Sequence, residues 1–213
     1  MDIHRSEEEQ VEALKAWWVE NGRSALFGVV LGLGTIFGWR AWQAHEVAQA
    51  EAASALYQRM LMASQQPGSD EIRKQAEALV QQYPDSSYAV FGSMMLAKAA
   101  VDAGDLAKAA TLLGTALNKN KDDVVNLELR LRLAQVQNAQ DRHADALATL
   151  NISTGKDYLA AFDELRGDIE VRRGNVNEAR AAYESALTAA REAGTDVTVL
   201  ELKLDNLGRV QKS

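Results

Sequence analysis

The side chains that most often carry catalysis are few in this sequence, and they lie far apart. The three histidines, His4, His45 and His143, fall in three separate stretches, and cysteine is absent. Without cysteine the chain has no disulfide, no thiolate nucleophile and no cysteine-ligated metal site. The sequence also lacks the His-Glu-x-x-His, Gly-x-Ser-x-Gly and Gly-x-x-x-x-Gly-Lys motifs of zinc proteases, serine hydrolases and phosphate-binding loops. We therefore predict no catalytic, cofactor-binding or metal-binding residue.

Two pairs of adjacent carboxylates are the remaining candidates for acid–base chemistry. Asp122 precedes Asp123, and Asp163 precedes Glu164. Adjacent residues on a helix point in different directions, so neither pair is placed to share one proton. Carboxylates are also favourable in the first turn of a helix, near the positive end of its dipole. We interpret these residues as helix starts or solvated positions, and expect His143 to open a helix with its ring on the surface.

The elements that would position these side chains are predicted to be helices throughout. The chain has 213 residues, only two prolines and few runs of β-branched residues, which favours an all-α fold. Lysine and arginine total 23 against 30 aspartates and glutamates, a net charge of −7. This balance provides no overall basic field, so nucleic acid is not an expected partner.

One apolar stretch near the N-terminus has the character of a membrane-spanning helix. Residues 24–39 are uncharged and are bracketed by Arg23 and Arg40. At about 1.5 Å per residue they cover about 24 Å of a hydrocarbon core of about 30 Å, and the arginine side chains can reach outward to the interface. The four tryptophans of the chain flank the stretch, as an interfacial aromatic belt does: Trp17, Trp18, Trp39 and Trp42. We predict a transmembrane helix over 23–43, in contact with the lipid bilayer.

One alternative interpretation of this stretch is a buried core helix. Another is a cleaved signal peptide, because 48–50 (Ala-Gln-Ala) has the form of a cleavage site. A signal peptide begins with a short basic stretch, whereas more than 20 residues rich in glutamate precede this one. Basic residues are slightly more frequent before the span than after it, which favours a cytoplasmic N-terminus. We expect an amphipathic cytoplasmic helix over 1–22 and a translocated domain over 44–213.

Glycines recur at helical spacing within the span. Gly28 and Gly32 form one small-xxx-small pair, and Gly34 and Gly38 form another on a face about 120° away. Such pairs allow close helix–helix packing in membranes, which makes the four glycines candidate packing positions. The alternative is that glycine is simply frequent in membrane helices.

The remaining sequence contains a repeat in three segments, 94–117, 131–153 and 164–187. Each segment has a turn residue: Gly104, Asp141 or Gly174. Seven positions before the turn lies a small residue: Ala97, Ala134 or Gly167. Five positions after the turn lies an alanine: Ala109, Ala146 or Ala179. A bulky residue follows (Leu113, Leu150, Tyr183), and then another small one (Ala116, Ser153, Ala186). A period near 34 residues with small residues at helix crossings is typical of the tetratricopeptide repeat, with an ordinary helical bundle as the alternative.

The flanks of the repeats are also predicted to be helical. One helix is expected to run from the membrane span through Met62, since proline and glycine next occur at Pro67 and Gly68. A weaker helix follows over 71–83, and residues 195–210 are expected to form a terminal helix that caps the stack. The fold class is thus all-α, a single N-terminal transmembrane helix followed by a tetratricopeptide-repeat-like α-solenoid.

Certain positions of the first helix of each repeat are expected to line a concave groove. These candidate partner-binding residues are Phe91, Met94, Lys98, Val101, Asp102, Glu128, Leu131, Gln135, Asn138, Glu164, Asp168 and Arg172. Their mixture of apolar and charged side chains suits a peptide segment or an unfolded chain better than a phosphate or nucleic acid.

The whole chain resembles the YfgM family of proteobacterial inner-membrane proteins. The resemblance rests on residues 6–43, SEEEQVEALKAWWVENGRSALFGVVLGLGTIFGWRAWQ, on 81–89, QQYPDSSYA, and on 200–207, LELKLDNL. It implies an ancillary subunit of the SecYEG translocon, anchored in the inner membrane with its repeats in the periplasm. It also implies the membrane-anchored chaperone PpiD as a partner and newly translocated, unfolded proteins as clients. Family members are also described as restraining a stress-response regulator from the cytoplasmic side.

The sequence therefore favours a non-enzymatic, chaperone-like scaffold over an enzyme. A repeat scaffold for assembly of another envelope complex, or a membrane-bound regulator of a stress-response protein, is the alternative, because repeat domains on single anchors serve many machines.

Overall fold

The computed structural model describes residues 7–64, 70–153 and 155–210, and these residues are almost entirely helical. The break expected at Pro67 and Gly68, and the first six residues of the expected cytoplasmic helix, lie outside the described residues. The chain divides into two compact units, Met1–Glu51 and Ala52–Ser213.

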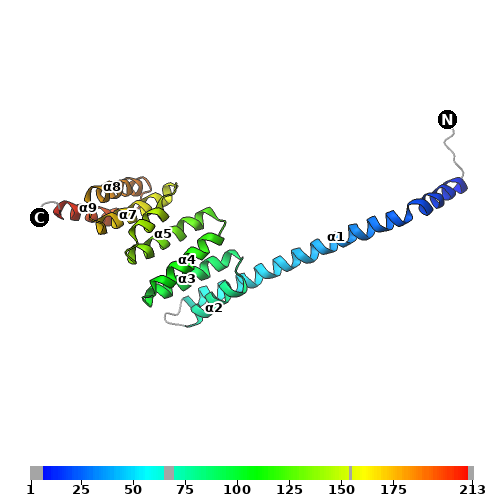
Figure 1. Cartoon of the computed structure of the whole chain (residues 1–213), viewed down its shortest axis with the longest axis horizontal. Coiled ribbons are helices and arrows are strands. Elements are labelled where there is room, and N and C mark those ends of the chain that lie inside the picture. Colours follow the sequence, from blue (N-terminus) through cyan, green and yellow to red (C-terminus); the bar gives the residue numbers. More distant parts are fainter. Residues whose placement is uncertain (1–6, 65–69, 154, 211–213) are drawn as a thin grey trace, which may run out of the picture. The chain divides into compact units, whose positions relative to one another are not determined.

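The first unit consists of the N-terminal part of helix α1 (Glu7–Ser64) (Figure 1). Within the described residues, this is the one helix long and apolar enough to cross a membrane, with a mean hydropathy of 1.4 in its most apolar window. No part of that window is buried, which is inconsistent with the core-helix alternative. The helix continues without interruption past residue 43 to Ser64, as its lack of proline and glycine there predicts.

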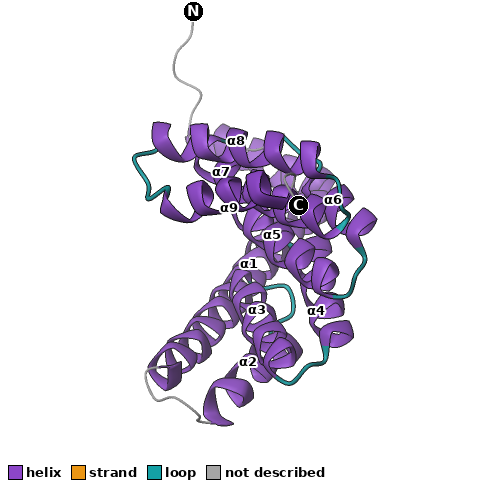
Figure 2. Cartoon of the chain, turned by 90° about the vertical axis from the view of Figure 1, so that its left-hand side faces the viewer, coloured by secondary structure: helices purple, strands orange, loops and turns teal. Residues whose placement is uncertain are grey.

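The second unit is a stack of helices formed by the last part of α1 and by α2 to α9 (Figures 1 and 2). Each helix from α2 to α5 contacts the next along the chain, as do α5 and α6, α6 and α7, α7 and α8, and α8 and α9; α5 also contacts α7. The helices are α2 (Asp70–Gln82), α3 (Ser87–Asp102), α4 (Leu106–Lys119), α5 (Asp123–Ala139), α6 (His143–Leu150), α7 (Lys156–Arg172), α8 (Val176–Glu192) and α9 (Thr198–Val210). The three sequence repeats correspond to the pairs α3 with α4, α5 with α6, and α7 with α8.

Each repeat turns at the residue that the sequence alignment marks. Gly104, Asp141 and Gly174 have φ of 77°, 58° and 78°, and Gly194 adds a fourth such turn, with φ 68°, between α8 and α9. In the first turn the amide of Asp105 donates to the carbonyl of Ala100 at 2.8 Å, a six-to-one hydrogen bond that closes the helix end. Glycine is favoured here because it adopts positive φ without a steric penalty.

The predicted small residues lie where helices of a pair cross. Ala97, Ala134, Ala109, Ala146 and Ala179 are all at most 2% exposed. A side chain at Gly167 would collide with the ring of Tyr183, so α7 and α8 approach each other more closely than a larger residue permits. One aligned position is wrong: α6 ends at Leu150, and Ser153 is exposed beyond it instead of packing at a crossing.

Four apolar clusters run through the stack. The first joins Ala53 and Met60 of α1 to Ala76 and Leu79 of α2, so the last part of α1 is the first helix of the stack. The others are centred on Leu113 and Leu129, on Leu150 and Phe162, and on Tyr183 and Leu200. The last cluster packs α9 onto α8, as predicted for a terminal helix.

Candidate partner-binding surface

Four of the side chains considered for chemistry have structural partners: Asp122, His143, Asp163 and Glu164. Asp122 caps α5 by accepting hydrogen bonds from the amides of Val124 and Val125, as expected for a helix start. His143 opens α6, but its ring is partly buried and lies 2.9 Å from the Asn138 side chain, so the expectation of a surface ring is wrong. His45 is exposed on α1, and His4 lies outside the described residues.

The second carboxylate pair has no shared site. Asp163 accepts hydrogen bonds from Arg166 at 2.5 Å and from Ser185 at 2.6 Å, whereas Glu164 binds Lys203 at 2.7 Å. Across the part of the chain that the structure describes, no group of three or more histidine, aspartate or glutamate side chains is placed to hold a metal ion.

A groove of about 220 Å³ lies between α3 and α5, with Leu106 and Leu113 of α4 at its base. Four of the predicted groove residues line it together: Met94, Lys98, Val101 and Gln135. Four apolar residues complete its α3 and α5 walls or base, Ala97, Val136, Ala139 and Leu106, and Val101 remains 40% exposed. The groove therefore offers an apolar surface that the described residues leave uncovered.

Two cationic side chains, Lys98 and Arg132, also line this groove. Each forms an ion pair one turn away on its own helix, Lys98 with Asp102 at 2.7 Å and Arg132 with Glu128 at 2.6 Å. Asp102 and Glu128 were themselves predicted as groove residues, but they are not among the lining side chains. The lining thus contains cations and no carboxylate.

Four other predicted groove residues serve the fold. Phe91 packs against the ring of Tyr57 with centroids 5.3 Å apart, and Leu131 is partly buried against the cluster of Leu150 and Phe162. Asn138 is 6% exposed, and its carbonyl accepts a hydrogen bond from Arg172 at 3.4 Å. These residues do not join the groove.

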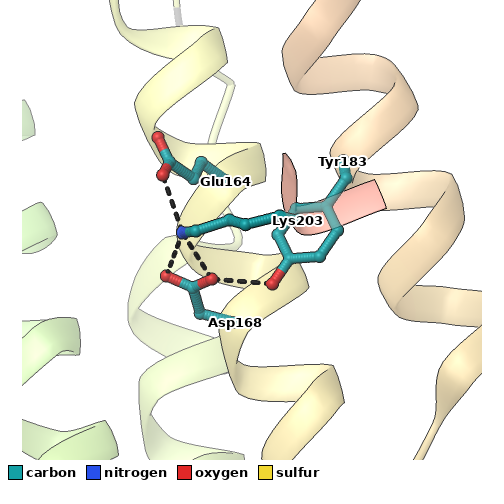
Figure 3. Close-up of polar contacts among 4 residues, drawn as sticks. All are labelled: Glu164, Asp168, Tyr183 and Lys203. Atoms are coloured by element: carbon teal, nitrogen blue, oxygen red, sulfur yellow. Dashed lines mark hydrogen bonds and ion pairs between the residues drawn. The ribbon is translucent and has the colours of Figure 1, made fainter. Parts of the chain in front are cut away.

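Two of the predicted residues of the third repeat, Glu164 and Asp168, are engaged by α9 (Figure 3). The Lys203 ammonium donates to Glu164 at 2.7 Å and to both oxygens of Asp168 at 2.6 and 2.9 Å. The Tyr183 hydroxyl donates to Asp168 at 2.7 Å, and the ammonium lies 5.6 Å from the centre of the tyrosine ring. This cluster, which we call the α9 latch, links α7, α8 and α9.

The α9 latch changes the ionisation of two of its members. Burial, followed by the hydrogen bond to Asp168 and the charges of Asp168 and Glu164, raises the pKa of the Tyr183 phenol. Burial of the Lys203 ammonium by itself lowers its pKa, but the hydrogen bonds and charges of Asp168 and Glu164 outweigh burial, and the pKa of Lys203 is raised. Both groups are therefore held in their protonated forms.

Sequence reasoning missed Arg132 and Lys203. Arg132 follows Leu131 directly, and successive side chains on a helix differ in direction by about 100°, so the prediction of Leu131 as a groove residue did not include its neighbour. Lys203 lies 35 and 39 positions from its two partners, so no local pattern indicates the contact.

The four glycines predicted as packing positions lie on an open part of α1. A Cβ atom added at Gly28, Gly32, Gly34 or Gly38 would meet no atom of the chain within 4 Å. On the same helix, the rings of Trp39 and Trp42 are in tilted contact with centroids 5.0 Å apart, and both remain more than half exposed. The glycine faces are therefore not used by the chain's own packing, and their role stays a prediction.

The chain is similar over nearly its full length to named proteins. A family model described as a tetratricopeptide repeat-like domain matches residues 15–209. A Haemophilus influenzae protein named "Ancillary SecYEG translocon subunit" is 36% identical, covering 94% of this chain and 97% of the relative. A relative of the same name from Escherichia coli is 34% identical, covering 97% and 99%, and one from Aggregatibacter actinomycetemcomitans is 30% identical, covering 94% and 97%. No solved structure gave a significant match. The chain therefore belongs to the YfgM family of tetratricopeptide-repeat-like proteins.

Proposed function

We propose that this protein is a non-catalytic ancillary subunit of the SecYEG translocon. The observation that carries the proposal is the full-length similarity to three relatives of that name, at 30–36% identity. The similarity includes the apolar helix as well as the repeats, because it covers at least 94% of this chain. No cofactor is part of the proposal.

In this proposal α1 anchors the protein once in the bacterial inner membrane, with 23–43 as the span. Trp18 and Trp39 are 21 residues apart, about 31 Å along a helix, which matches a hydrocarbon core of about 30 Å. Residues 1–22 lie in the cytoplasm and 44–213 form the periplasmic domain, in agreement with the basic residues before the span. The faces of Gly28 with Gly32 and of Gly34 with Gly38 pack against membrane helices of the translocon.

The repeat domain binds partner proteins in the periplasm, a PpiD-type chaperone and newly translocated periplasmic or outer-membrane proteins. Stacked helix pairs present extended surfaces that suit protein segments. The open groove of Met94, Lys98, Val101 and Gln135 supports this role, since its apolar lining is not covered by the described residues.

Site-specific crosslinking in intact membranes tests the anchor. A photoreactive residue is placed at Gly28, at Gly38, or at Leu33, which lies about 120° from both glycine faces and serves as the matched control. We expect the glycine positions to capture a translocon subunit more efficiently than Leu33 does. Capture of other membrane proteins with no translocon subunit would contradict the proposal and favour a scaffold for another envelope complex or a membrane-bound stress regulator.

The orientation has its own test. A reporter enzyme that is active only in the cytoplasm, fused after residue 213, is expected to be silent, while the same reporter fused at residue 1 is active. An active C-terminal fusion would show that the topology is the reverse of the proposed one.

A further inference from the structure

The groove between α3 and α5 has a counterpart between α7 and α9, and the two differ in what fills them. In the first repeat, Met94 lies three positions before the small residue Ala97, and Lys98 lies one position after it. In the third repeat, Glu164 and Asp168 lie at these same two positions relative to Gly167. At the second place, the side chain of Lys203 from α9 is 27% exposed, and its ammonium bonds both carboxylates. At the first place the equivalent residues line an open groove.

Between α7 and α9, the side chain that meets these positions is a lysine, whose long aliphatic part ends in a charge opposite to that of Glu164 and Asp168. The charge of the open groove is reversed, because Lys98 stands where Asp168 stands in the third repeat. Arg132 adds a second cation from the facing helix. Its Nε atom binds Glu128, and its two terminal nitrogens make no hydrogen bond within the described parts of the chain, so the forked end remains available to a carboxylate.

The size of the groove limits the occupant to about one large side chain. Its volume is about 220 Å³, and Ala97, Leu113 and Val136 are the buried residues of its apolar lining. Burial of one Phe, Leu or Met side chain against this lining favours binding, because it removes apolar surface from water.

We infer that this groove is the docking site for a protein segment in which one large apolar side chain is flanked by carboxylates. The apolar side chain lies against the apolar lining between α3 and α5, and the flanking carboxylates interact with Arg132 and Lys98 at the rim. The inference rests on the proposed function only in that both make the repeat domain a binder of protein segments.

The test uses the full-length protein in detergent micelles and two fluorescein-labelled nine-residue peptides. Each peptide has one central phenylalanine in a Gly/Ser background, flanked by two glutamates in one and by two lysines in the other. We expect fluorescence anisotropy to show roughly 3- to 10-fold tighter binding of the glutamate peptide, as two exposed ion pairs would give. Equal affinities for the two peptides, or no binding of the glutamate peptide, would overturn the inference.

The repeats supply a position-matched control. Val101 and Val171 lie four positions after Ala97 and Gly167, and they are 40% and 43% exposed, but only Val101 lines the groove. V101E is expected to weaken binding of the glutamate peptide at least 10-fold, because it adds a carboxylate to the apolar lining of the groove, and V171E is expected to leave binding within twofold. Equal effects of the two substitutions would also overturn the inference.

A rim variant keeps the test independent of folding. Arg132 is 47% exposed, so R132Q preserves the helix and is expected to remove most of the preference for glutamate over lysine. If R132Q still prefers the glutamate peptide to the lysine peptide as strongly as the wild type does, the inferred contact between Arg132 and a carboxylate is overturned. Crosslinking from Gly28 in the same V101E variant separates the two proposals, because translocon capture through the anchor should persist whether or not the groove binds peptide.

Discussion

Gly167 holds α7 and α8 at a separation that no residue with a side chain permits, because the Tyr183 ring occupies the place of its missing Cβ. The ring in turn directs its hydroxyl to Asp168 in the α9 latch. One absent methyl group therefore positions the tyrosine that helps to attach the terminal helix.

G167A is expected to lower the free energy of unfolding by about 1–3 kcal/mol, the usual cost of overpacking. G114A is the matched control, since a Cβ atom in that helix meets nothing within 4 Å and should stabilise α4 by about 0.5–1 kcal/mol. Urea denaturation followed by circular dichroism measures both. A neutral G167A would show that the ring of Tyr183 moves aside without cost.

The α9 latch also predicts how stability depends on pH. The pKa values of Tyr183 and Lys203 are raised above their ordinary values of 10.0 and 10.5. Above about pH 10 the unfolded chain releases these protons while the folded chain retains them, so the free energy of unfolding falls as pH rises. Below pH 10 both contributions are fully present.

Y183F removes the tyrosine contribution and should make the decline between pH 10 and 12 shallower. Thermal denaturation at half-unit pH steps measures the slope, with Y158F as the control outside the latch. Parallel curves for the wild type and Y183F would show that the phenol does not contribute.

At the scale of the helix, α9 docks on the stack through both apolar and ionic contacts. Leu200 and Leu207 are buried against α8, while Lys203 joins α9 to Glu164 and Asp168 of α7. On the groove side of α5, the apolar Val136 lines the space between α3 and α5. The end of the stack thus depends on a charge cluster where the middle depends on apolar packing.

K203A should loosen α9 selectively, because it leaves two partly buried carboxylates beside each other. We expect hydrogen exchange of the α9 amides to become faster by the equivalent of about 1–2 kcal/mol, with α2 to α4 unchanged. R191A is the control: the Arg191–Glu201 pair joins α8 to the same helix but is 60% and 51% exposed, so its loss should cost less than about 1 kcal/mol. Equal effects would contradict a special role for Lys203.

The elements that follow local rules were predictable from the sequence. Small residues at fixed distances from Gly104 and Gly174 predicted helix pairs and their turns, because close packing and positive φ each restrict the residue type at one position. The end of α6 was not predictable: Ser153 fits the pattern, yet the helix stops at Leu150, where the amide of Ile152 bonds back to its carbonyl.

The candidate groove was predictable only in part. Met94, Lys98 and Val101 share one helix face and follow from periodicity. The residues of α5 that face them, and the residue of α9 that binds Glu164 and Asp168, depend on the register between helices separated by more than 30 positions. No local pattern encodes that register.

For the molecule as a whole, the described contacts of the repeat domain join near neighbours. The stack therefore resembles a one-dimensional array, in which stability is transmitted from each layer to the next. The loss of stability caused by a substitution at one end should therefore decrease with distance along the stack.

F162A, at a fully buried position, should cost about 3–5 kcal/mol and reduce hydrogen-exchange protection in α5 to α9 more than in α2 and α3. L79A, fully buried at the other end, should produce the reverse gradient. A uniform loss of protection in both variants would show that the repeat domain unfolds as one cooperative unit.

The end of α1 is also the first helix of the stack, since Ala53 and Met60 pack against α2. From this helix onward, each helix of the stack contacts helices that are near to it along the chain, so the contact order is low. Each helix therefore finds its packing partner as soon as the next helix is present. Contacts between near neighbours in sequence form rapidly, because little loop-closure entropy is lost before they are made. A repeat domain that reaches its compartment with the N-terminal end first can thus fold layer by layer, and exposes at any moment only the apolar face that the next helix will cover.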